Sequence, residues 1–212
     1  AVAMAERFLG RPIRSALDVG CGEARWRAEL LLLRPKLFYQ GVEPSAYAVK
    51  RFGKRRNIVQ GGFTELKQLD VGGPFDLVIC ADVLHYLDVD DLERGLPALV
   101  TLTGGLAYLE LLTDQEEVEG DQRELKLRPP SLYRELFSSA GLSSVGCHGW
   151  LAPGFAEALR ICLRQDPNVV MVGEMRDVET MQTVLTLAET GHLVLATVHS
   201  GTCAEALQRV VL

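Results

Sequence analysis

The chain has 212 residues, of which 48% are hydrophobic and 24% charged, and its formal net charge is −6. The length allows one large domain or one domain with a further fragment. The acidic balance argues against a general nucleic-acid-binding protein, which would be basic. No apolar run reaches membrane-spanning length, and the five cysteines are scattered without a C-x-x-C pair. We therefore expect a cytoplasmic protein without membrane insertion, with buried thiols and neither disulfides nor a metal site.

Apolar strand-like runs alternate with helical patterns over the first 150 residues. The pattern predicts strands at 15–19, 38–42, 57–60, 75–81 and 105–112, with helices at 24–33, 45–52 and 90–102 between them. A loop or lid follows at 113–130. The last elements of this part are a helix with its N-cap at Ser131 and its end at Gly141, and a strand at 142–150. This alternation is typical of the α/β class with a doubly wound, mostly parallel sheet.

The pattern restarts after Pro153, without a repeat that links the two parts. The second part predicts a helix at 155–164, a strand at 168–172, a helix at 177–190, a strand at 192–198 and a helix at 202–211. We therefore predict two domains, residues 1–153 and residues 154–212. A less favoured arrangement places 168–172 at the edge of the first sheet.

The turn after the first strand carries two glycines, Gly20 and Gly22, behind the acidic Asp18. Such a turn lets a ligand approach the backbone at the carboxyl ends of the strands. Glu43 ends the second strand, where an acid can accept hydrogen bonds from both hydroxyls of a ribose. A dinucleotide site needs a third glycine at the position of Arg25, so nicotinamide and flavin cofactors are disfavoured.

These residues resemble the class I S-adenosylmethionine-dependent methyltransferases over about residues 8–152. Residues 16–23 resemble the first motif of that family, Glu43 its ribose-binding acid, 75–87 its fourth motif and 104–110 its fifth strand. The resemblance implies a Rossmann-like sheet that ends in a seventh, antiparallel strand. No such strand is recognisable before the chain changes character, so we expect the final strand to be missing. Ala24 replaces the third glycine of the first motif, a mild change if its φ is negative.

The resemblance implies methyl transfer from S-adenosylmethionine to an unidentified acceptor by in-line displacement, with positioning as the main catalytic effect. The candidate cofactor-binding residues are Asp18, Gly20, Cys21, Gly22, Glu43, Phe63 and Asp82. Phe63 has two equally weighted interpretations, as a cover for the adenine ring or as a core residue. His85 and Tyr86 are candidate catalytic residues, with His85 as a general base or, equally, a locally packed histidine.

A second resemblance covers residues 155–212. Segments 166–177 and 189–200 resemble the Walker B and histidine-box region of type II secretion and type IV pilus retraction ATPases, with Glu174 and His199 at the matching positions. No G-x-x-x-x-G-K-[ST] phosphate loop occurs in the sequence. We therefore predict a partial P-loop ATPase fragment that hydrolyses no ATP by itself, within a composite or truncated chain. The alternative function is an interaction module that contacts a secretion or pilus ATPase ring.

Overall fold

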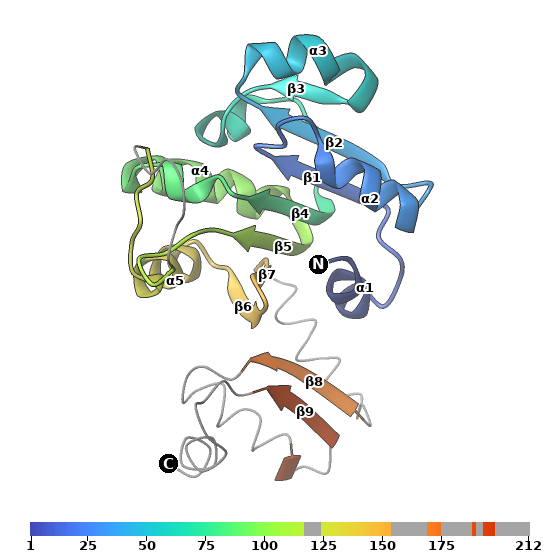
Figure 1. Ribbon diagram of the computed structural model, residues 1–212. Coiled ribbons are helices and arrows are strands. Elements are labelled where there is room, and N and C mark those ends of the chain that lie inside the picture. The colour runs from blue at the N-terminus through green and yellow to red at the C-terminus, as the bar shows by residue number, and fades with distance from the viewer. Residues whose placement is uncertain (117–123, 154–168, 175–187, 190–192, 198–212) are drawn as a thin grey trace. The chain divides into compact units, whose positions relative to one another are not determined.

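The computed structural model describes residues 1–116, 124–153, 169–174, 188–189 and 193–197 (Figure 1). The chain divides into two compact units, Ala1–Ser144 with His148–Ala156, and Val145–Cys147 with Glu157–Leu212. The helices of the described part are α1 Val2–Leu9, α2 Arg25–Leu33, α3 Ala46–Arg56, α4 Val89–Leu102 and α5 Pro130–Ser139, with 3₁₀ turns η1 Phe63–Gln68 and η2 Leu84–Tyr86. The strands are β1 Ser15–Val19, β2 Phe38–Glu43, β3 Ile58–Gln60, β4 Phe75–Ala81, β5 Thr103–Glu110, β6 Ser143–Gly146, β7 Gly149–Leu151, β8 Val169–Glu174 and β9 Leu193–Thr197.

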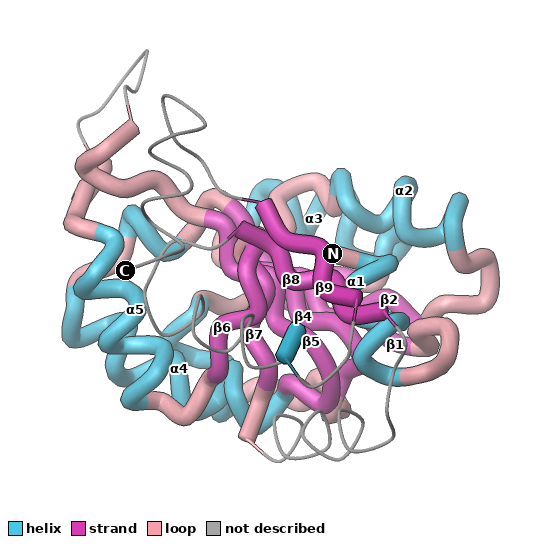
Figure 2. Tube along the Cα trace, turned by 90° about the horizontal axis from the view of Figure 1, so that it is seen from below, coloured by secondary structure: helices cyan, strands magenta, loops and turns pink. Residues whose placement is uncertain are grey.

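The first seven strands form one sheet in the order β3-β2-β1-β4-β5-β7-β6. Strands β1 to β5 are parallel to one another. Helices α2 and α3 lie on one side of this sheet, and α4 and α5 on the other (Figure 2). The predicted doubly wound α/β class is therefore confirmed. The predicted order of strands and helices up to β5 is confirmed as well, with element ends shifted by up to four residues.

The expectation of a missing final strand is wrong. Strand β7 runs antiparallel to β5, with Leu106 opposite Leu151 and Tyr108 opposite Gly149. The single strand predicted at 142–150 is two strands, because the chain turns at Cys147 and His148. Both residues have positive φ, 48° and 60°, as the central residues of a type I′ hairpin turn require. This turn brings the chain back into the sheet within two residues.

The main hydrophobic core lies between the sheet and helices α4 and α5. It includes Leu17 of β1, Val78 of β4, Leu109 of β5, Leu99 of α4 and Phe137 of α5, all at most 2% exposed. The strand side chains that alternate with these point to the opposite face, which α2 and α3 cover. Because both faces are covered, β1 and β4 are buried over almost their whole length.

A short helix that the sequence pattern did not predict, α1, begins the chain. Two ion pairs connect this region to the sheet and to α2. Arg11 donates from both terminal nitrogens to Asp76 of β4, at 2.7 and 2.8 Å, and Arg34 pairs with Glu6 of α1. Helix α5 also differs from expectation, since it begins at Pro130 after Pro129 rather than at an N-cap on Ser131.

In the second unit, β8 and β9 form a separate parallel pair, with Val170 opposite Val194 and Glu174 opposite Thr197. The two predicted strands, 168–172 and 192–198, are therefore found with shifted ends. The idea that 168–172 completes the edge of the first sheet is wrong, because β8 pairs with β9. The predicted helices 155–164 and 202–211, and all of 177–190 except 188–189, lie outside the described residues.

Candidate functional site

The glycine turn after β1 lies close to the turn after β4. The amide nitrogens of Gly20 and Cys21 both donate to the carbonyl of Val42, at 2.8 and 3.1 Å, which joins the turn to β2. Gly20 has a φ of 72°, and a Cβ atom at this position would lie less than 3.0 Å from Val83 Cγ2. Glycine is therefore required here both by backbone conformation and by the approach of the next loop.

Glu43, at the end of β2, lies across this turn. Its Oε2 accepts a hydrogen bond from the amide of Gly22 at 2.8 Å, and its Oε1 accepts one from the amide of Ser45 at 3.0 Å. The residue is 8% exposed. A carboxylate offers about four lone-pair sites, so two acceptor positions remain for a ligand. The backbone thus holds Glu43 in one orientation, facing the ligand edge of the sheet.

A cavity of about 360 Å³ opens beside these groups, at the carboxyl ends of β1 to β4. Of the residues predicted from the sequence, those that line it are Gly20, Glu43, Phe63, Asp82 and Tyr86. Asp18, Cys21, Gly22 and His85 are not among its lining residues. The structure therefore brings together residues from four strand ends. Asp18, Cys21 and His85 are buried away from the cavity, and Gly22 is half-buried in the glycine turn.

The cavity lining is acidic. Glu43, Asp82 and Asp91 contribute carboxylates, and no lysine, arginine or histidine belongs to its lining in the described part of the chain. Asp91, in the first turn of α4, is paired with Arg94. Asp91, Val83, Leu87 and Thr64 also line the cavity, and the sequence patterns did not predict them as site residues. Asp91 follows another aspartate at a helix start, a pattern that by itself indicates only a favourable helix N-terminus.

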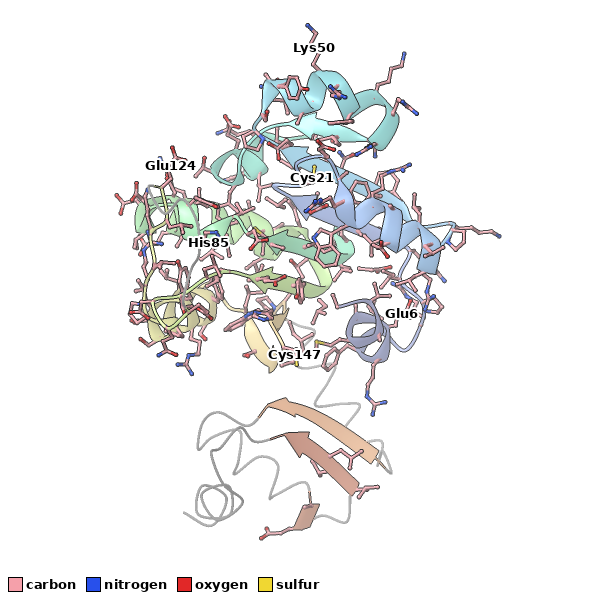
Figure 3. The ribbon with its side chains drawn as sticks, viewed as in Figure 1. Glu6, Cys21, Lys50, His85, Glu124 and Cys147 are labelled. Carbon is pink, nitrogen blue, oxygen red and sulfur yellow. The ribbon has the colours of Figure 1, made fainter. Side chains whose placement is uncertain are left out.

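Asp18 is buried behind the glycine turn and is 2% exposed. Its Oδ2 accepts a hydrogen bond from the Tyr39 hydroxyl at 2.6 Å. Burial raises the pKa of Asp18 to about 6 despite this bond, and the negative charge of Glu43 adds to the rise. Burial also raises the pKa of the neighbouring Cys21 thiol to about 12. Cys21 is therefore a packing residue of the turn, not a thiolate nucleophile (Figure 3).

Phe63 belongs mainly to the core. Its side chain is 4% exposed and packs on α4 at Gly95, where a Cβ would lie less than 3.0 Å from the ring. Between the two predicted interpretations, the structure favours core packing, with only an edge of the residue at the cavity. Ala24 also differs from expectation, because its φ is 59° rather than negative. The replacement of the third glycine is therefore strained and not mild.

His85 is buried in η2 and 1% exposed (Figure 3). Its Nδ1 accepts a hydrogen bond from the amide of Leu112 at 3.0 Å. Burial lowers the pKa of His85, while the nearby Asp82 acts in the opposite direction. The unprotonated ring nitrogen is thus occupied, which argues against His85 as a general base. Tyr86, by contrast, is 46% exposed and lines the cavity.

The cysteines differ in their surroundings. Cys21 and Cys80 are buried free thiols, whereas Cys147 is exposed in the hairpin turn, so the expectation of buried thiols is wrong for Cys147. Cys162 and Cys203 lie outside the described residues. In the part of the chain that the structure describes, no group of three His, Cys, Asp or Glu side chains is arranged to hold a metal ion. None of the described helices is long and apolar enough to cross a membrane.

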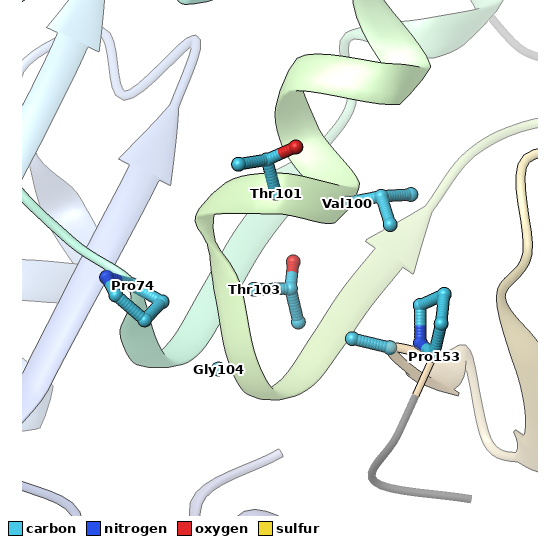
Figure 4. Close-up of a pocket in the computed structure, with 7 residues that line it drawn as sticks. Pro74, Val100, Thr101, Thr103, Gly104 and Pro153 are labelled. Atoms are coloured by element: carbon cyan, nitrogen blue, oxygen red, sulfur yellow. The ribbon is translucent and has the colours of Figure 1, made fainter.

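A second cavity, of about 470 Å³, lies at the opposite edge of the sheet (Figure 4). Its walls include Pro74, Thr103 and Gly104 at the amino ends of β4 and β5, with Pro153 after β7. All its lining side chains are apolar or threonine. It offers no titratable group for chemistry, so the acidic cavity is the candidate site.

Of the ATPase-like residues, Glu174 is the last residue of β8, opposite Thr197 of β9. The two parallel strands therefore end together at this point. His199 lies outside the described residues.

The first unit has the seven-stranded methyltransferase fold, and the comparisons with known proteins agree with it. Residues 17–104 match the family model described as "Methyltransferase domain". A SAM-dependent methyltransferase from Archaeoglobus fulgidus superposes with a TM-score of 0.54 at 20% identity, over 68% of each chain. Human N-acetylserotonin methyltransferase superposes with a TM-score of 0.51 at 21% identity, over 67% of this chain and 48% of that one. At these identities the likeness shows the fold.

Residues 139–211 match the family model described as "Type II/IV secretion system protein". The type IV pilus retraction ATPase PilT of Pseudomonas aeruginosa is 57% identical over 58 residues, which are 27% of this chain and 17% of that protein. The Escherichia coli protein YggR is 56% identical over 57 residues, or 18% of its length. The chain thus combines a methyltransferase fold, with a match to a methyltransferase family model at 17–104, and a segment similar to secretion ATPases. It spans less than a fifth of these curated relatives.

Proposed function

We propose that residues 1–153 form a methyltransferase domain that binds S-adenosylmethionine in the acidic cavity and transfers its methyl group to an acceptor not yet identified. The observation that carries this proposal is the orientation of Glu43. Backbone amides of Gly22 and Ser45 donate to its two carboxylate oxygens, at 2.8 and 3.0 Å, and Glu43 lines the cavity. A carboxylate has about four lone-pair sites, so two remain to accept from the two hydroxyls of a ribose.

The charge of the cavity supports a sulfonium cofactor over a phosphorylated one. Glu43, Asp82 and Asp91 line it without a basic lining residue in the described chain. A pyrophosphate or triphosphate would meet like charge there, whereas a sulfonium cation meets opposite charge. A methyl sulfonium supplies an activated methyl group with a neutral leaving group. The residues present therefore fit S-adenosylmethionine better than they fit NAD or ATP.

Positioning carries the proposed catalysis. Gly20, Glu43, Phe63 and Asp82 hold the cofactor, and Asp18, Cys21 and Gly22 support the turn behind it. Placing a nucleophile in line with the methyl group removes much of the entropic part of the barrier. Tyr86 is exposed at the cavity and is our candidate for contact with the acceptor.

We also propose a cytoplasmic location, supported by the free thiols of Cys21, Cys80 and Cys147.

Calorimetric titration with S-adenosylhomocysteine tests this function. Wild-type protein is expected to bind, and Glu43→Ala to bind at least about 100-fold more weakly, because two hydrogen bonds to a charged group are lost at about 1.5–3 kcal/mol each. Glu23→Ala is the matched control, since Glu23 is an exposed acid of the same turn that does not line the cavity. Thermal melts establish that both variants fold. Absence of binding to the wild type, or equal binding by Glu43→Ala, would refute the proposal.

A second candidate function concerns residues 154–212. The identity of 57% to PilT over 58 residues, in a sequence without a phosphate loop, favours a non-hydrolysing module that contacts a pilus or secretion ATPase ring. The test is co-purification of the full chain with purified PilT hexamers. Capture that is unaffected by Glu43→Ala supports the module, and absence of capture argues against it.

A further inference from the structure

The segment that follows β5 is held on η2 by a set of hydrogen bonds. Two described stretches, 111–116 and 124–128, are here called the strap. The amide of Leu112 in the first stretch donates to His85 Nδ1 at 3.0 Å. The amide of Lys126 in the second stretch donates to the carbonyl of the same His85 at 2.8 Å. One buried residue therefore receives both stretches of the strap.

Further bonds join the strap to the residues after η2. Arg128 Nη2 donates to the carbonyl of Leu87 at 2.6 Å, and Lys126 Nζ lies 2.9 Å from Asp88 Oδ1. The amide of Asp114 donates to the carbonyl of Arg128 at 3.1 Å, which ties the two stretches to each other. Tyr86 and Leu87, which these bonds surround, line the acidic cavity. The position of this cavity wall is thus connected to the strap.

We propose that His85 is a positioning residue, which sets the place of Tyr86 and Leu87 in the cavity wall by accepting the Leu112 amide while neutral, and which releases Leu112 when protonated. An amide N–H only donates, so Nδ1 must be the unprotonated nitrogen in this contact. Protonation places an N–H opposite the Leu112 N–H, and two donors cannot bond. The Lys126 bond to the His85 carbonyl is independent of this proton.

Burial and the nearby charge of Asp82 act on the pKa of His85 in opposite directions. Asp82, in the turn before η2, favours the protonated ring, whereas burial disfavours it. Lys126 and Arg128 approach from the strap, with Lys126 paired to Asp88. The net effect lowers the pKa of His85 below its ordinary value of 6.5. The contact with Leu112 is therefore formed at neutral pH and is lost as the pH falls through this lowered pKa.

The first test measures hydrogen exchange at the Leu112 amide by NMR, and needs no assumption about the proposed function. At pH 7.5 the amide is expected to be protected at least 10-fold more in the wild type than in His85→Ala. His85→Asn keeps an acceptor oxygen near the position of Nδ1 and is expected to restore protection. Lowering the pH from 7.5 through the lowered pKa of His85, with intrinsic exchange rates corrected, is expected to reduce protection in the wild type but not in His85→Asn. The wild-type titration remains informative if His85→Ala fails to fold.

The second test measures the affinity for S-adenosylhomocysteine, and rests on the proposed function. His85→Ala is expected to bind about 5–10-fold more weakly, and His85→Asn as the wild type does. As the pH falls through the lowered pKa of His85, the wild type is expected to lose more affinity than His85→Asn, since the titration of Asp18 is common to both. His148→Asn, in an exposed histidine, is the control and should behave as the wild type.

Equal Leu112 protection in His85→Ala and wild type, or a His85→Asn variant as unprotected as His85→Ala, would overturn the positioning role. Confirmed Leu112 protection without any ligand binding would instead leave the role of His85 standing and refute the proposed cofactor site.

Discussion

The contact between the glycine turn and the loop after β4 predicts a specific cost for Gly20→Ala. The backbone there has a φ of 72°, and the new Cβ would lie less than 3.0 Å from Val83 Cγ2. A left-handed conformation costs a non-glycine residue about 1–2 kcal/mol, and overpacking costs about 1–3 kcal/mol. We therefore expect the free energy of unfolding to fall by about 2–5 kcal/mol, measured by urea denaturation.

Two further variants separate these contributions. Gly10→Ala carries a similar φ, 64°, with no atom within 4 Å of the new Cβ, so it reports the conformational cost alone, about 1–2 kcal/mol. In the background of Val83→Ala, which removes the obstructing methyl groups, Gly20→Ala should cost no more than Gly10→Ala does. The double-mutant cycle is then coupled by about 1–3 kcal/mol. Additive effects of Gly20→Ala and Val83→Ala would show that the two turns do not touch in this way.

Two more predictions concern stability. Burial raises the pKa of Asp18 from 3.8 to about 6, so the folded state holds this proton more tightly than the unfolded state does. The free energy of unfolding should therefore fall as the pH rises from about 4 to 6, and should not change further above pH 6 through this group. Asp18→Asn keeps an acceptor for the Tyr39 hydroxyl and should remove this pH dependence, and its free energy of unfolding should be higher by at most about 3 kcal/mol at pH 7.5. An unchanged pH dependence in urea denaturation between pH 4 and 7.5 would contradict the raised pKa of Asp18. Replacing the exposed turn residues by Cys147→Asn with His148→Gly should raise the melting temperature by about 2–4 °C, because asparagine and glycine adopt positive φ more readily. A lower melting temperature would show that the positive φ of Cys147 and His148 does not limit the stability of the protein.

The alternation of apolar runs and amphipathic segments was sufficient to predict the parallel strands β1 to β5. The same holds for the glycine turn at Gly20 and the acid at Glu43, because a strand that ends in an acid and a glycine turn is written in consecutive residues. The hairpin at Cys147 and His148 could not be predicted in this way. Cysteine and histidine lack the signal that Asn-Gly carries. Pairing with β5, 39 residues earlier in the case of Leu109 and His148, imposes their conformation.

The residue patterns were sufficient to predict the fold of the first unit and the likeness of the segment after Pro153 to secretion ATPases. Packing in the folded protein determines which side chains reach the candidate site. His85 and Phe63 are candidate site residues by their place in the sequence, yet packing buries both. The amide of Leu112 also donates to Nδ1 of His85. Burial and lone-pair occupancy depend on partners that are distant in the chain, and local residue patterns do not contain this information.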